Sequence, residues 1–178
     1  MAVMSGGDAE KWVAFVQARL DEDEALAKAA LEAGHSEWGD RPWAVTECSG
    51  PEPDHEGCPC IVYQGEYKPF EEPQVPPIQY VADAEEPEHA AHIARHDPAR
   101  ALREVAAKRA ILAEHGPGED GSVWCRVCDP AADMNDSDRW YPCKTVRLLA
   151  PVWSGHPDYA AITSETEQSM TPSQRRNR

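Results

Sequence analysis

Apolar residues recur at helical spacing near the start of the chain. Between Asp8 and Leu31 they would form one stripe on a helix, made by Trp12, Val16, Leu20, Ala27 and Leu31. Asp8 is a favourable N-cap, and Gly34 is a residue type that often follows a helix. The pattern predicts a helix over residues 8–34, and the acidic run 21–24 within it is interpreted as a solvated face.

The stretch 39–81 has a different character, rich in proline, glycine and acidic residues. Three short β-prone pieces interrupt it: Trp43–Thr46, Ile61–Gln64 and Ile78–Val81. Proline cannot donate a ladder hydrogen bond, so the proline-rich segment before the third piece is expected to be loop. The pattern predicts a small antiparallel β-meander.

Helical patterning returns from residue 87. Pro87 suits a first helical turn, and the Asp97-Pro98 pair predicts a break followed by a new helix that Asp97 caps and that ends at His115 and Gly116. Its predicted buried stripe comprises Leu102, Val105, Ala106 and Leu112.

A last helix is expected from about Pro142. Pro151 should shorten or kink it, because proline lacks the backbone donor that a helix interior needs. The fold predicted is α+β and mainly α, with three to four helices and the β-meander inserted after the first. We expect one small domain over 1–162, whose part 87–162 is helical and binds zinc, and a disordered tail over 163–178.

Composition narrows the class of protein. Hydrophobic residues make up 41% of the 178 residues and there are 16 prolines, which predicts a small core with much connecting chain. The N-terminus has no secretory pattern, and no run of 18 apolar residues could span a membrane. We therefore expect a cytoplasmic protein, in which the six cysteines serve as metal ligands rather than disulfides.

The charge is concentrated in one half of the sequence. Residues 1–97 carry 21 acidic and 6 basic side chains, whereas residues 98–178 carry 11 of each. A solvated acidic surface explains this, and so does an acidic face that docks on a basic protein partner. Direct nucleic-acid binding is disfavoured by repulsion from phosphates.

Four residues in the C-terminal half form the strongest candidate metal site. Cys125 and Cys128 make a C-x2-C knuckle, Cys143 follows at the expected start of the last helix, and His115 closes the preceding helix. His156 is the rival fourth ligand. Three thiolates and one imidazole complete a tetrahedral zinc site, and a closed set of four indicates a structural ion.

Two further groups carry ligand-type side chains. The first, a weaker candidate for a second zinc, comprises Cys48, His55, Cys58 and Cys60. The second comprises His89, His92 and His96, which share one face of the predicted helix and could hold a catalytic metal, as in a hydrolase. Ile93, however, occupies the position where zinc proteases of similar histidine spacing carry their glutamate base.

The segments AAHIARHDPARALREVAAKRAILAEH (90–115), YPCKTVRLLAPVWSGHPDY (141–159) and VAFVQARLDEDEALAKAA (13–30) resemble an uncharacterised domain-of-unknown-function family of actinobacteria and their phages. The resemblance implies a small helical protein, often cytosolic or phage-encoded, with a histidine and cysteine set that maps onto His115, Cys125, Cys128 and Cys143. The family usually ends in a charged, Trp-containing segment, whereas Ala160-Ala161-Ile162 follows here.

Together these observations favour a zinc-stabilised binding or regulatory module that contacts another protein. The alternative is a metal-dependent hydrolase that uses His89, His92 and His96.

Overall fold

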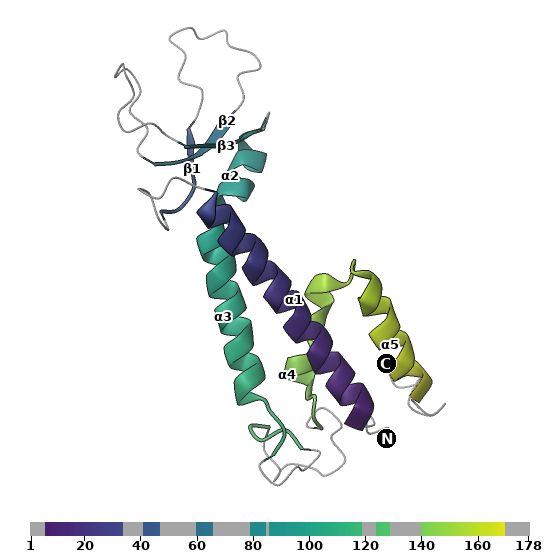
Figure 1. Cartoon of the computed structure of the whole chain (residues 1–178). Coiled ribbons are helices and arrows are strands. Elements are labelled where there is room, and N and C mark those ends of the chain that lie inside the picture. Colours follow the sequence, from purple (N-terminus) through teal and green to yellow (C-terminus); the bar gives the residue numbers. More distant parts are fainter. Residues whose placement is uncertain are drawn as a thin grey trace, which may run out of the picture. The chain divides into compact units, whose positions relative to one another are not determined.

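The computed structural model describes residues 6–33, 41–46, 60–65, 79–84, 86–118, 124–128 and 140–169. Figure 1 shows the elements in chain order: α1 (Gly6–Glu32), β1 (Ala44–Thr46), β2 (Cys60–Gln64), β3 (Gln79–Ala84), α2 (Pro87–Arg95), α3 (Pro98–Glu114), α4 (Lys144–Arg147), the 3-10 helix η2 (Ala150–Trp153) and α5 (Pro157–Ser169). The described chain is mainly helical with one small antiparallel sheet, which confirms the predicted fold class.

The chain divides into two compact units. The first unit combines Met1–Glu22 with Val105–Arg178, and the second unit is Asp23–Glu104. The boundaries fall inside α1 and inside α3. The single domain over 1–162 stays a prediction.

The second unit is built around the three-stranded sheet. The strands lie in the order β1-β2-β3 and all pair antiparallel, which is the predicted meander. The β2–β3 register shifts between Val62 and Tyr63, where a bulge adds local twist. Helix α2 packs on the sheet (Figure 1). Ala90 of this helix is buried against Val62 and Ala84.

Asp97 separates α2 from α3. Its side chain is almost fully buried, and Oδ1 accepts a hydrogen bond of 2.6 Å from the backbone N–H of Arg100. This satisfies a backbone donor at the helix start that has no partner within the helix. The predicted break at Asp97-Pro98 and the N-cap are therefore confirmed.

The core of the first unit lies along one face of α1. Trp12, Phe15, Val16 and Leu20 are buried together with Val105 of α3 and Ala150 of η2. Leu112, Leu149, Trp153, Tyr159 and Ile162 pack against them. The predicted apolar stripe of the first helix is buried at Trp12, Val16, Leu20 and Ala27, and Leu31 is partly buried. On α3, Val105 is buried but Ala106 is exposed, contrary to the predicted stripe.

Several charged side chains of α1 have basic or acidic partners. Asp21 lies 2.5 Å from Arg109 of α3, and Glu22 lies 2.7 Å from Arg19 one turn earlier. Glu24 pairs with Lys28 at 2.6 Å. The acidic run is therefore partly neutralised within the chain, although the Asp21 side chain remains 72% exposed.

The C-terminal part differs from the single helix expected there. Helix α4 has only four residues, and η2 follows it with Pro151 near its start. This agrees with the predicted disruption at Pro151, where the missing N–H prevents an α-helix from continuing. Helix α5 then extends to Ser169, past residue 163, where the predicted disordered tail begins. None of the described helices is both long enough and apolar enough to cross a membrane.

Candidate metal centre

The end of α3 is brought to the C-x2-C knuckle by backbone pairing. His115 continues the helical ladder, since its N–H donates to the carbonyl of Ile111 at 3.0 Å. The chain then runs alongside the knuckle: Gly118 N–H donates to Trp124, and Arg126 N–H donates to Gly116, both at 3.0 Å. These two bonds flank a bridge between Pro117 and Cys125. The hairpin-like pairing therefore fixes Cys125 next to His115.

The Arg126 side chain strengthens the same junction. Its Nε donates to the carbonyl of Glu114 at 3.1 Å, and its Nη2 donates to the carbonyl of Ala113. Helix α3 has no basic residue in its own last turn, so Arg126 supplies a positive charge to that negative helix end from outside. This role is not among the features predicted from the sequence. The sequence offers one signal for it: α3 has no basic residue in its last turn, whereas the knuckle that follows contains Arg126.

Cys143 enters the centre from the other side. An isolated bridge pairs Trp124 with Trp140, whose rings lie 4.7 Å apart between centroids, and this brings the chain before α4 to the knuckle. Cys143 is the N-cap residue of α4, as predicted.

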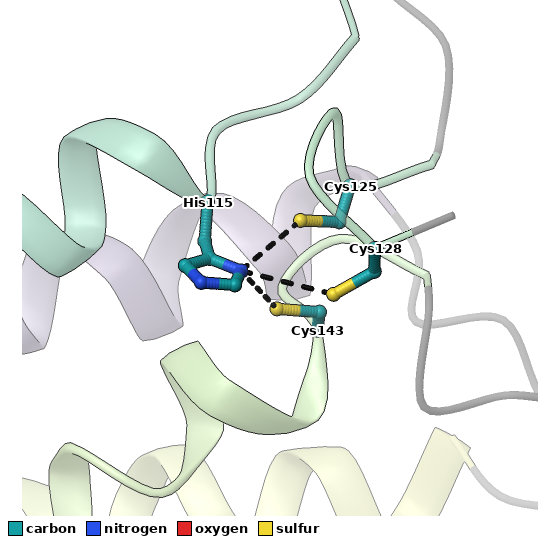
Figure 2. A group of neighbouring side chains, drawn as sticks. All are labelled: His115, Cys125, Cys128 and Cys143. Atoms are coloured by element: carbon teal, nitrogen blue, oxygen red, sulfur yellow. Dashed lines mark hydrogen bonds between the residues drawn. The ribbon is translucent and has the colours of Figure 1, made fainter. Parts of the chain in front are cut away.

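The four predicted ligands converge in the structure. His115 Nδ1 lies 3.5 Å from Cys125 Sγ, 3.7 Å from Cys128 Sγ and 3.5 Å from Cys143 Sγ, as the dashed lines of Figure 2 mark. All four ligand atoms lie within 4.8 Å of one another. Zn–S bonds of about 2.3 Å and Zn–N bonds of about 2.0–2.1 Å give N···S edges of about 3.6 Å in a tetrahedron. The cluster therefore has the dimensions of a four-coordinate site.

Hydrogen bonding alone does not explain this arrangement. A ring nitrogen carries either one hydrogen or one lone pair, so Nδ1 can make at most one of its three sulfur contacts as an ordinary hydrogen bond. Figure 2 shows three sulfurs around that one nitrogen. A cation at the centre would satisfy all four atoms at once, so the residues fit a bound metal ion.

The thiols differ in their acidity. Although burial opposes ionisation, backbone hydrogen bonds from Cys128 and Val127 hold the pKa of Cys125 below its ordinary value. Burial, together with the neighbouring sulfurs of Cys125 and Cys143, raises the pKa of Cys128 to about 12. Without a metal ion, Cys128 therefore keeps its proton at neutral pH. A bound divalent cation would displace that proton, as metal binding to cysteine requires.

The centre is part of the packed interior of the first unit. Cys125 and Cys143 are 1% and 0% exposed, and with the fully buried Val146 they form a cluster against Val13 and Leu112. Burial, followed by the charges of the two cysteines, also raises the pKa of Tyr141. Cys128 and His115 are partly buried. Core side chains therefore enclose the site on the side of Cys125 and Cys143.

The rival ligand His156 lies elsewhere. Its Nε2 contacts Arg19, its Nδ1 accepts a hydrogen bond of 3.2 Å from the backbone N–H of Asp158, and its ring lies 6.0 Å from that of Phe15. His156 thus belongs to the core beside α1 and is no ligand of this cluster. The buried Arg19 that contacts it is a second feature that the apolar pattern of α1 did not indicate.

The remaining predicted groups are not assembled into metal sites by the described residues. Cys48, His55 and Cys58 lie outside the described residues, as does the side chain of Cys60, so the second zinc stays a prediction. Across the described ranges, the four-residue cluster is the only group of three or more ligand-type side chains that could hold an ion. His89, His92 and His96 are therefore not gathered into the three-histidine site that a hydrolase would need.

Fold and site together define a small, mainly helical protein with a compact cluster of one histidine and three cysteines. Residues 9–161 match a family of unknown function (DUF6221), and the chain belongs to that family. The matched range contains the three-stranded sheet and all four cluster residues. No match was found among curated proteins or among solved structures.

Proposed function

We propose that His115, Cys125, Cys128 and Cys143 bind one zinc ion with a structural role. The observation that carries the proposal is the set of 3.5–3.7 Å contacts from one imidazole nitrogen to three sulfurs. Thiolate and imidazole ligands favour zinc over magnesium or calcium. Four protein ligands leave no open position for substrate, which favours a structural ion over a catalytic one. The proposal includes a cytoplasmic location, because a reducing compartment keeps thiols available.

Metal analysis of the full chain tests the zinc proposal. We expect one zinc per chain in the wild type and none after combined Cys125→Ser and Cys128→Ser substitution. The matched control is combined Cys48→Ser and Cys58→Ser, which removes the same number of thiols from the second candidate group. A wild-type protein without zinc, or a knuckle variant that binds as much zinc as the wild type, would refute the proposal. Two ions in the wild type and one in the control variant would assign the second zinc.

The biochemical role proposed is that of a zinc-stabilised binding or regulatory module, with no catalytic step. The acidic half of the sequence supports a basic protein surface as its partner, since residues 1–97 carry 21 acidic against 6 basic side chains. Because Asp21, Glu22 and Glu24 already pair with basic side chains, the docking charge is better sought at other acidic positions of this half.

A charge-matched comparison tests this role. Zinc-loaded protein serves as bait in extracts of its native host, alongside a variant with Glu52, Asp54 and Glu56 changed to their amides. The control variant neutralises Asp133, Asp136 and Asp138, an equal charge in the other half of the chain. The role is supported by a partner that binds the wild type and the control variant but not the first variant. Its binding should also weaken as salt is added. Equal retention by all three proteins, or retention of DNA instead, contradicts it.

The proposed origin is actinobacterial or phage-encoded, because segments 90–115 and 141–159 resemble a family of actinobacteria and their phages. Gene neighbourhood provides the check. Structural or lysis genes beside the coding sequence would indicate a phage accessory protein, and housekeeping genes would indicate a host regulator. Occurrence confined to other lineages would overturn this origin.

A further inference from the structure

Two histidines stand one turn apart at the C-terminal end of α2. His92 lies in the last turn of the helix and His96 is its C-cap residue. Both side chains are exposed, and their ring centroids lie 4.2 Å apart with an angle of 36° between the planes. This spacing brings side chains together because residues four apart are neighbours on a helix surface.

The ring of His96 is held in a defined orientation. Its Nδ1 lies 2.8 Å from the carbonyl oxygen of His92, and since a carbonyl can only accept, Nδ1 carries the proton and donates. The other nitrogen, Nε2, then carries the lone pair. Histidines that bind metals commonly donate one ring N–H to a carbonyl in this way, which fixes the tautomer that leaves the second nitrogen available. His96 is therefore prepared for coordination through Nε2.

The surroundings tolerate a cation at this position. Arg100 approaches the same turn, where its Nη1 donates to the carbonyl of Arg95 at 3.2 Å. Its positive charge is balanced by Glu104, whose carboxylate lies 2.7 Å from Nε. The described structure gives the ring nitrogens of His92 no hydrogen-bond partner, so a lone pair of that ring is also available.

We propose that His92 and His96 form a surface site that chelates one late first-row divalent transition-metal ion, Ni²⁺ or Cu²⁺ in particular. Two imidazoles supply the protein ligands and water completes the coordination shell. Imidazole ligands suit these ions, and affinity rises along the series toward copper. His89 does not join the other two in a three-ligand group. With two protein ligands the ion is exchangeable, unlike an ion held by the four ligands of the cysteine cluster.

Calorimetric titration of untagged, zinc-loaded protein with Ni²⁺ tests the site, and Ni²⁺ is used because it does not oxidise thiols. We expect one Ni²⁺ per chain beyond the zinc. His92→Ala and His96→Ala should each weaken binding by about tenfold or more, because a second tethered ligand acts at a high effective concentration. His89→Ala is the matched control, another exposed histidine of the same helix, and should bind as the wild type does.

A zinc-sensitive dye in the same titration distinguishes added binding from exchange at the cysteine cluster. Zinc release that matches Ni²⁺ uptake would overturn the proposal. Equal affinity of wild type and His92→Ala would overturn it as well, and so would a loss in His89→Ala as large as that in His96→Ala. All three substitutions change exposed side chains, and circular dichroism confirms that each variant folds.

Discussion

Gly116 lies directly beneath the guanidinium of Arg126. A Cβ added at Gly116 would fall 2.6 Å from Nη2 of Arg126 and 3.1 Å from its Cζ, closer than a carbon atom can sit without movement. The glycine therefore leaves the space through which Arg126 reaches the carbonyls of Ala113 and Glu114. This contact joins the end of α3 to the knuckle.

Replacing Arg126 by alanine should destabilise the first unit. The substitution removes two charge-assisted hydrogen bonds to helix carbonyls, and because the side chain is exposed we expect a loss of about 1 kcal/mol in the free energy of unfolding. Urea denaturation of the zinc-loaded protein measures it. Arg103→Ala, which removes an exposed arginine earlier on α3, should change stability by less than about 0.5 kcal/mol. Equal losses in the two variants would contradict the capping role.

Two leucines of α1 offer a direct test of the core. Leu20 is fully buried, whereas Leu26 is 72% exposed. Leu20→Ala should cost about 2–5 kcal/mol, because it removes buried methyl groups and leaves a cavity. Leu26→Ala should stay within about 0.5 kcal/mol of the wild type. Thermal unfolding of both variants checks the difference, and similar melting temperatures would show that α1 does not pack as described.

The cap at Asp97 predicts a contrast between two substitutions. Asp97→Ala removes the acceptor for Arg100 N–H and should cost about 0.5–2 kcal/mol. Asp97→Asn keeps an oxygen acceptor at the same place and should retain most of the stability. Urea unfolding curves of the two variants give the comparison. If asparagine were as damaging as alanine, the negative charge rather than the cap would be the important property.

Removal of the metal ion should loosen the first unit. Structural zinc contributes about 10–16 kcal/mol of apparent binding free energy in zinc-finger peptides, which is comparable to the stability of a whole domain. After chelation we expect a lower melting temperature and a changed tryptophan fluorescence signal. The rings of Trp124 and Trp140 lie beside the cluster, with their centroids 4.7 Å apart, so loosening the cluster should alter their surroundings. The variant without Cys125 and Cys128 should not respond to chelator. A wild-type protein that loses its metal with no change in either signal would contradict this expectation.

The sequence predicted those elements whose signals are local. Asp97-Pro98 marked a helix boundary because a cap and a restricted backbone act within a few residues, and Pro151 marked the disruption that separates α4 from η2. The cluster could also be predicted, since C-x2-C, a third cysteine and a histidine at a helix end limit the possible geometries. Even the choice of His115 over His156 followed from its place beside the knuckle.

Features that depend on distant contacts were not predicted. Arg126 and Arg19 act through partners that only the folded chain brings near, so neither residue stands out from its neighbours in the sequence. The continuation of α5 beyond residue 162 was not predicted, because its sequence is polar and has no clear apolar stripe; among its described side chains, Tyr159 and Ile162 pack against the core. Tertiary contact overrode weak local preference there.

The pairing of α1 with late parts of the chain has a consequence for synthesis on the ribosome. Val16 and Leu20 emerge well before Ala150 of their buried cluster, which is made 130 residues after Leu20. Chains are synthesised at about 5–20 residues per second, so on the order of ten seconds pass before the last core neighbour of this helix is made. During that interval the apolar side of α1 is a natural binding site for chaperones, which would make production in cells sensitive to their supply.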